Sequence, residues 1–303
     1  ILVSLDQKGF PINNIVIKSS PIIVDLYGNN FQNIIFGSDD NNVYGYMVDG
    51  IEMFGFPYST GDDVRSSPAV ADLDKNNSLE LIIGSHDGSL DILSGFGQQL
   101  ATYQVNGSIN GSPAAIDLDQ DGDLEVVFTS YNGSTGDVHA IHHNGSTFYS
   151  FPVNLNEKML GGAAAGDLDG DGYPELVVCT DDDNIYAINK DGSIMPGFPF
   201  TSTDRFFNAP TLVDLDGDSD LEIVVGNRRG TLHVLYHDGT EMASYDVGDD
   251  IRGGISVADL NDDGSYELLF TGYDDMIHVW NPIDGLELDG WPVDMEDNSL
   301  TEP

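Results

Sequence analysis

Basic residues are scarce in this chain of 303 residues. Only 10 Lys and Arg stand against 52 Asp and Glu, which gives a formal net charge of −42. This balance argues against nucleic acid as a partner, because contact with a phosphate backbone requires a basic face. Two hypotheses explain the excess of acid: part of it binds cations, or the surface is adapted to a salty environment.

Cysteine and long apolar runs are also lacking. Cys179 is the single cysteine, so it has no disulfide partner within the chain. It follows the apolar residues LVV and is predicted to be a buried apolar residue. No apolar run approaches the roughly 20 residues of a membrane helix, so membrane insertion is not expected. The first residues contain neither an initiator Met nor a signal sequence, and we interpret the chain as a processed or excerpted segment.

What the chain does contain is an acidic segment that recurs six times. The first aspartates of successive copies are 45 to 50 residues apart. The copies are DLYGNNFQNIIFGS from Asp25, DLDKNNSLELIIGS from Asp72, DLDQDGDLEVVFTS from Asp117, DLDGDGYPELVVCT from Asp167, DLDGDSDLEIVVGN from Asp214 and DLNDDGSYELLFTG from Asp259.

Each copy lies among four short runs typical of strands. Strand A precedes the acids, strand B follows them, strand C carries a Tyr, Asp or His, and strand D lies near GFP or GWP. Tandem four-stranded units of about 40–50 residues predict the blades of a β-propeller. Helical spacing of apolar residues is lacking, which argues against a βα solenoid.

We therefore predict an all-β chain that forms a single β-propeller domain over residues 1–303. The N-terminal ILVSLDQKGFPIN is interpreted as the end of a further unit that closes the ring beside the last blade. Six blades are predicted, with seven as the alternative.

The acidic segments follow the pattern D-x-[DN]-x-[DN]-G-x-x-E. Positions 1, 3, 5 and 9 offer oxygen side chains, and position 7 adds a peptide carbonyl. Several hard oxygen ligands around a sharp turn suit Ca²⁺ better than Mg²⁺, which retains more water. The alternative is that Asp, Asn and Gly only form turns. Five copies with an acid at position 9 favour metal, and we predict four to five calcium ions.

The predicted ligands are grouped by copy, with position 7 contributing its carbonyl. They are Asp72, Asp74, Asn76 and Glu80; Asp117, Asp119, Asp121, Asp123 and Glu125; Asp167, Asp169, Asp171, Tyr173 and Glu175; Asp214, Asp216, Asp218, Asp220 and Glu222; and Asp259, Asn261, Asp263, Ser265 and Glu267. The last four copies are expected to bind best and the Asp72 copy less well. The Asp25 copy keeps one carboxylate and is expected to bind no ion.

These repeats resemble the FG-GAP/VCBS family, the calcium-binding propeller repeats also found in the head of integrin α subunits. The resemblance extends from about Asp6 to Pro292. It implies a propeller with ions on the face that carries the A–B loops. It also implies an extracellular, secreted or cell-surface protein with a role in adhesion, recognition or carbohydrate association.

No catalytic motif is present, so we expect a protein that binds a protein or glycan partner and is not an enzyme. The alternatives are a structural subunit of a larger surface protein, a self-assembling extracellular polymer and, third, a polysaccharide lyase. Lys18, Arg65 and Arg252 share one repeat position and predict an anion-binding site, unless each simply pairs with an acidic neighbour. Asn106, Asn132 and Asn144 are predicted glycosylation acceptors.

Overall fold

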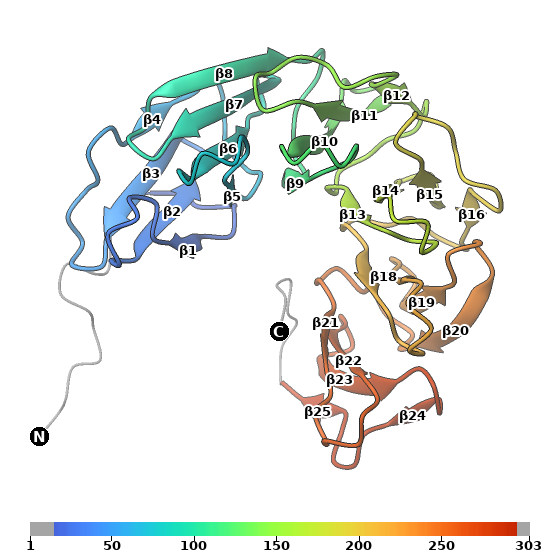
Figure 1. The fold of residues 1–303 in the computed structure, drawn as a ribbon. Coiled ribbons are helices and arrows are strands. Elements are labelled where there is room, and N and C mark those ends of the chain that lie inside the picture. Colours follow the sequence, from blue (N-terminus) through green and yellow to red (C-terminus); the bar gives the residue numbers. More distant parts are fainter. Residues whose placement is uncertain (1–14, 296–303) are drawn as a thin grey trace, which may run out of the picture. The chain divides into compact units, whose positions relative to one another are not determined.

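The computed structural model describes residues 15–295, in which 25 β-strands and no helices are found (Figure 1). The chain divides into two compact units, Ile1–Asn156 and Glu157–Pro303. Each unit is described by itself, so the single domain and the closure of a ring stay predictions. The N-terminal stretch expected to close the ring falls on residues 1–14, outside the described residues. Among residues 15–295 there is no helix long and apolar enough to span a membrane.

The first unit contains three antiparallel sheets of four strands. Sheet 1 is formed by β1 (Ile22–Val24), β2 (Asn33–Gly37), β3 (Asn42–Met47) and β4 (Tyr58–Ser59). Sheet 2 is formed by β5 (Ala69–Ala71), β6 (Glu80–Gly84), β7 (Ser89–Ser94) and β8 (Gln99–Gln104). Sheet 3 is formed by β9 (Ala114–Ile116), β10 (Glu125–Tyr131), β11 (Gly136–Ile141) and β12 (Val153–Asn154).

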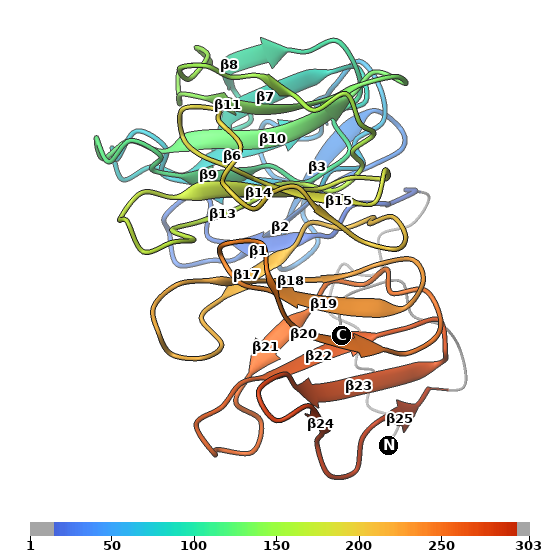
Figure 2. The ribbon, with the colours of Figure 1, turned by 90° about the vertical axis from the view of Figure 1, so that its right-hand side faces the viewer.

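The second unit contains two antiparallel sheets of four strands and one of five (Figure 2). Their strands lie side by side in chain order, except that β25 of the five-stranded sheet pairs with β23. Sheet 4 is formed by β13 (Ala164–Gly166), β14 (Glu175–Cys179), β15 (Asn184–Ile188) and β16 (Phe200–Thr201). Sheet 5 is formed by β17 (Thr211–Val213), β18 (Glu222–Gly226), β19 (Thr231–Leu235) and β20 (Glu241–Asp246). Sheet 6 is formed by β21 (Ser256–Ala258), β22 (Glu267–Thr271), β23 (Met276–Asn281), β24 (Leu286–Glu287) and β25 (Val293–Asp294). The predicted four strands per repeat are confirmed.

The apolar cores lie between consecutive sheets. Leu81 and Ile83 of β6 pack with Ile35 of sheet 1, whereas Ile82 between them packs with Val126 and other residues of sheet 3. Strand β6 is therefore buried on both faces, which explains why the run after each acidic segment is continuously apolar. The second unit repeats this arrangement, with Cys179 in the core between sheets 4 and 5. The prediction of a buried cysteine is confirmed.

Glycine at the end of strand B makes room for the next sheet. A Cβ at Gly84 would lie 2.4 Å from Ile109 Cγ2, and one at Gly226 would lie 2.2 Å from Ile251 Cγ2. Each isoleucine comes from the D–A connection, the segment that leads into strand A of the following sheet. The glycine of GSH and GNR is thus required by a close approach between sheets.

The outer strands are of two kinds. In sheets 1, 3, 4 and 6, strand D follows a cis peptide bond to Pro57, Pro152, Pro199 or Pro292 and is two residues long. In sheets 2 and 5, β8 and β20 are continuous over six residues and contain a register shift. The GFP pattern missed the turn of sheet 3, because Ser150 stands there in place of glycine.

Candidate metal centres

The six acidic loops connect strand A to strand B at the same end of each sheet, and each is named here after its first residue. Backbone N–H groups organise the side chains within each loop. In the Asp117 loop, Gly122 N–H donates to Asp117 Oδ2 at 3.1 Å, and in the Asp167 loop, Gly172 N–H donates to Asp167 Oδ2 at 3.0 Å. The first aspartate is therefore fixed by the residue at position 6.

The remaining positions are held in the same way. Asp121 N–H donates to Asp119 Oδ1 at 3.3 Å, and Asp123 N–H donates to Asp121 Oδ1 at 2.9 Å. The glutamate at position 9 begins strand B, and its Oε2 accepts the N–H of position 2, as Glu125 does from Leu118 at 2.9 Å. In the Asp117 and Asp167 loops this leaves Oδ1 of the first aspartate for a ligand. Both oxygens of Asp72, Asp214 and Asp259 accept backbone N–H groups.

Positions 4 and 6 adopt the left-handed conformation in every loop. Gly170 and Gly217 occupy position 4, with φ of 71° and 82°. Position 6 is glycine in three loops, but Ser219 adopts φ of 83° in the Asp214 loop. Serine is strained in this region, so the loop keeps its shape at a local cost.

Four loops bring three carboxylates together. One oxygen from each residue lies within 4.8 Å of the others in the sets Asp72, Asp74 and Glu80; Asp117, Asp119 and Glu125; Asp167, Asp169 and Glu175; and Asp214, Asp216 and Asp218. These sets coincide with four of the five predicted calcium loops. Like charges at such distances repel, so a bound cation would stabilise them.

Three carboxylate oxygens of these loops are buried without a hydrogen-bond partner. They are Asp117 Oδ1, Asp167 Oδ1 and Glu222 Oε1. Burial, reinforced by the neighbouring aspartates, also raises the pKa of Glu175 and of Glu222 to about 7. Oxygen donors that are preorganised, desolvated and unsatisfied fit a hard divalent cation such as Ca²⁺.

The Asp259 loop differs from the four. Asn261 occupies position 3, where its amide donates to Asp263 Oδ2 at 2.9 Å and lies 3.5 Å from Glu267 Oε1. Its amide group thus stands where a cation would otherwise balance the two carboxylates. The expected order placed this loop above the Asp72 loop, whereas the structure gathers three carboxylates in the Asp72 loop.

The Asp25 loop keeps the same shape without the acids. Asn33 stands in place of the glutamate, and its Oδ1 accepts Leu26 N–H at 3.1 Å. Asn29 Oδ1 accepts Phe31 N–H at 3.0 Å, as the position 5 aspartates do elsewhere. Amide oxygens therefore replace the carboxylates at positions 5 and 9. Asp25 remains the single carboxylate, and its two oxygens accept the N–H groups of Asn29 and Asn30.

Residues of the C–D turns support the loops, and the sequence interpretation missed them. His143 Nδ1 lies 3.4 Å from Asp123 Oδ2, and His237 Nδ1 lies 3.0 Å from Asp220 Oδ2. Lys190 Nζ lies 2.8 Å from the centroid of the Tyr173 ring. Alignment of HHNG, NKDG and YHDG shows a nitrogen base at one position in each turn, and this signal was available in the sequence.

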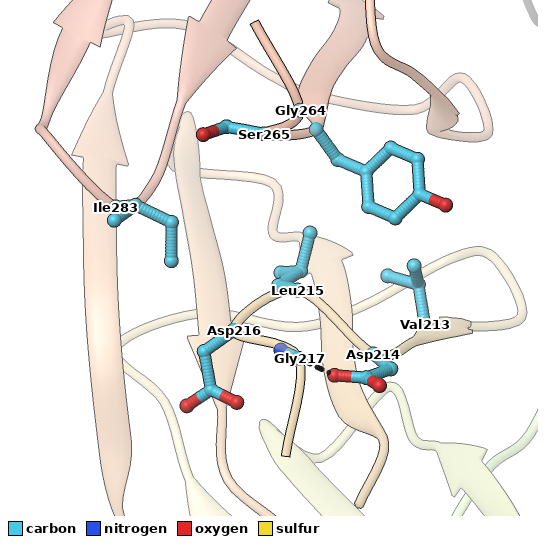
Figure 3. A pocket seen from close by; sticks show the side chains of 9 residues that line it. Val213, Asp214, Leu215, Asp216, Gly217, Gly264, Ser265 and Ile283 are labelled. Atoms are coloured by element: carbon cyan, nitrogen blue, oxygen red, sulfur yellow. Dashed lines mark hydrogen bonds between the residues drawn. The ribbon is translucent and has the colours of Figure 1, made fainter. Parts of the chain in front are cut away.

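A pocket of about 490 Å³ lies beside one candidate centre (Figure 3). Asp214 and Asp216 line it from sheet 5, and Ser265, Tyr266 and Ile283 line it from sheet 6. Asp214 accepts the N–H of Gly217 at 2.7 Å, shown as a dashed line in Figure 3. The Asp214 centre is therefore accessible from solvent.

The three cations predicted to bind an anion are placed as follows. Arg65 pairs with Asp39 and Asp63, each at 2.8 Å, and Arg252 pairs with Asp250 at 2.6 Å. Lys18 is exposed. Lys18 and Arg65 belong to the first unit and Arg252 to the second, so their convergence stays a prediction. The sequon residues Asn106, Asn132 and Asn144 are all exposed, and their glycosylation also stays a prediction.

Comparison with known families identifies the repeat. Residues 117–178 and 167–225 match the FG-GAP-like repeat. None of the curated proteins matches the chain in sequence.

Solved structures show the same fold. The biofilm matrix protein Bap1 of V. cholerae is 22% identical with a TM-score of 0.59, and the match covers 77% of this chain and 40% of Bap1. BamB of Moraxella catarrhalis is 13% identical with a TM-score of 0.63, over 92% of this chain and 78% of BamB. Sqt1 of Saccharomyces cerevisiae is 15% identical with a TM-score of 0.69, over 95% of this chain and 77% of Sqt1. This chain thus spans two fifths of the length of Bap1.

Proposed function

Because the chain carries FG-GAP-like repeats in a β-propeller-like fold, we propose that it is a calcium-stabilised, non-catalytic recognition module that acts outside the cell. It binds a protein or glycan partner. The observation that carries the calcium part is the set of buried carboxylate oxygens without hydrogen-bond partners in three loops. The likeness to a biofilm matrix protein supports the extracellular part.

The loop residues have separate tasks in this proposal. The side-chain oxygens at positions 1, 3, 5 and 9 would hold Ca²⁺, while the backbone N–H groups keep these side chains in place. Bound calcium supplies positive charge that compensates the repulsion among the carboxylates. Calcium thereby stabilises the acidic loops, which connect strand A to strand B and are exposed to a partner.

Chelation tests the calcium part. A cation that binds only the folded chain adds about 2.7 kcal/mol per site at a hundredfold excess over its Kd. We expect EGTA to lower the melting temperature strongly, calcium to restore it, and magnesium to restore little. An unchanged melting curve in EGTA rules out the calcium proposal.

Ion counting by native mass spectrometry assigns the sites. Glu175→Ala and Asp121→Ala are each expected to remove one ion and to destabilise the fold, because the remaining carboxylates repel without compensation. Asp25→Ala is the matched control and is expected to remove none. Equal ion loss from all three variants would contradict this assignment.

A second candidate function is a structural one, as a subunit of a larger surface protein or of an extracellular polymer. It is favoured by the likeness to a matrix protein of which this chain covers 40%. Electron microscopy of the calcium-loaded protein distinguishes the two roles. Regular filaments support a polymer, and isolated particles that bind glycans on an array support recognition.

A further inference from the structure

The chain's scarce basic residues gather at the end of the sheets opposite the acidic loops. Five of the 10 Lys and Arg lie there within sheets 4 to 6, on B–C turns and D–A connections. They are Lys158, Arg205, Arg228, Arg229 and Arg252. In a chain of charge −42, such a concentration of cations is a distinct feature of the second unit.

A recurring backbone hydrogen bond places two arginines side by side. The B–C turn of each sheet bonds the D–A connection that precedes it, as in Asp181 N–H to Lys158 O at 2.8 Å and Tyr273 N–H to Asp250 O at 2.9 Å. In sheet 5 the same bond joins Arg228 to Arg205 at 2.9 Å. The neighbouring pairs each include an aspartate, whereas this pair consists of two like charges.

Three arginines of this group surround one aromatic ring. The guanidinium carbons of Arg205, Arg228 and Arg252 lie 5.7, 5.9 and 5.0 Å from the centroid of Phe207. Arg252 also lies 4.9 Å from the centroid of Tyr273. Cation–π attraction holds guanidinium groups near a ring while their N–H groups remain available at its edge.

Two carboxylates are shared among Lys158 and these three arginines. Asp181 lies 2.8 Å from Lys158 Nζ but 3.5 Å from Arg205. Asp250 lies 2.6 Å from Arg252 but 3.6 Å from Arg228. The side chains of Arg205 and Arg228 are 36% and 39% exposed. Arg205 and Arg228 are therefore the weakly paired members of the group, although Arg252 is almost as exposed at 35%. Arg65, by contrast, is contacted by two carboxylates at 2.8 Å.

From this geometry we propose that Arg205, Arg228 and Arg252 around Phe207 form a binding site for the carboxylate of a uronic acid in an acidic polysaccharide. The proposal deepens the recognition function proposed above and rests on it. Arg205 and Arg228 bind the planar carboxylate through paired N–H donors. Arg252 packs on the Phe207 ring and adds positive charge to the site.

A sugar acid suits this surface better than a dense polyanion. The cations of the site are surrounded by acidic residues, including Asp181, Asp182 and Asp204. A ligand with many closely spaced charges is repelled by such a surface. A polysaccharide with one carboxylate in each disaccharide carries fewer charges, and its hydroxyl groups donate hydrogen bonds to nearby aspartates.

The test measures binding of a hyaluronan octasaccharide to the calcium-loaded protein by isothermal titration calorimetry. Its counterpart with every carboxyl group reduced to an alcohol has the same sugar backbone and no charge. We expect Arg205→Gln and Arg228→Gln each to weaken binding about tenfold or more, and Arg228→Lys to weaken it as well, since lysine lacks the planar fork. The wild type should bind the reduced octasaccharide at least as weakly as the Gln variants bind the acidic one.

Arg229→Gln is the matched control. Arg229 lies in the same turn and carries the same charge but is not one of the arginines around Phe207, so binding should change less than about twofold. Melting temperature and calcium content are measured on each variant to confirm that it folds.

Three results would overturn the proposal. These are equal binding by the wild type and the Gln variants, equal binding of the reduced octasaccharide, or binding of a peptide carboxylate in place of the sugar. If neutral glycans bind while the acidic one does not, the recognition function stands and this site falls. If chelation leaves the melting curve unchanged while the octasaccharide binds, the calcium part falls and this site stands.

Discussion

Leu124 N–H donates to the carbonyl of Leu73 at 2.8 Å, which ties the acidic loop of sheet 3 to that of sheet 2. The equivalent bond joins Leu221 to Leu168 at 3.1 Å in the second unit. These bonds run from position 8 of one loop to position 2 of the loop before it. Each of these backbone hydrogen bonds therefore couples two neighbouring candidate metal centres.

Asp119→Ala tests this connection. The variant should lose the ion of the Asp117 loop and weaken calcium binding by the Asp72 loop a few-fold, because a loop without its ion positions Leu124 less firmly. The amide signal of Asn77 in a calcium titration by NMR reports on the Asp72 loop, and that of Gly172 serves as the control. Saturation of Asn77 at the wild-type calcium concentration would show that the loops bind independently.

Ser219→Gly should stabilise the calcium-loaded protein by roughly 0.5–1 kcal/mol, because glycine adopts the left-handed conformation without the cost that serine has there. The N–H that donates to Asp214 Oδ2 is retained. Urea unfolding measures the change. Gly172→Ser, at φ of 94°, is the reciprocal control and should destabilise the protein by a similar amount.

Gly84→Ala should destabilise the first unit by about 1–3 kcal/mol, because the new methyl group collides with Ile109. Ile109→Ala removes the Cγ2 atom and leaves the Ile109 Cβ position 3.1 Å away. A double-mutant cycle in urea should therefore show that Gly84→Ala costs less in the Ile109→Ala background. Additive effects would place the strain elsewhere.

Protonation of His139 is predicted to destabilise the folded protein in acid. Burial lowers its pKa from 6.5 to about 4, with Asp137 opposing the shift. The folded state therefore favours the neutral ring. The contribution of neutral His139 to the free energy of unfolding is complete above pH 6.5 and decreases as the pH falls towards 4. The loss reaches about 3 kcal/mol at pH 4.

The comparison of wild type with His139→Phe isolates this effect, since loss of calcium in acid is common to both proteins. The stability of the wild type should decrease relative to the variant between pH 6.5 and 4. A constant difference over this range would mean that His139 titrates alike in the folded and unfolded chains.

The repeat made most of the fold predictable. The residues from Asp117 to Val127 contain the loop ligands and the start of a doubly buried strand, so a single alignment indicates loop, strand B and metal chemistry together. The outer strands were less predictable, because Ser150 obscures the GFP pattern and because β8 and β20 have no proline turn. Of the arginine site, the sequence predicted Arg252 as an anion-binding residue, and Arg205 and Arg228 were missed for a different reason. The site combines the B–C turn of sheet 5 with the D–A connections of sheets 5 and 6, which occupy separate columns of the alignment and meet only in the folded chain.

The two kinds of outer strand have a consequence for how the protein resists aggregation. A two-residue edge offers few free backbone groups to another chain, so four of the six sheets are poor templates for intermolecular pairing. Among the described strands, β8 and β20 present six-residue edges. Glu241 and Asp246 give β20 negative charge at both ends, whereas Gln99–Gln104 carries none. The tendency of the protein to aggregate at high concentration therefore depends on β8, the edge strand of sheet 2. One lysine or glutamate added to β8 would protect this edge from pairing with another chain.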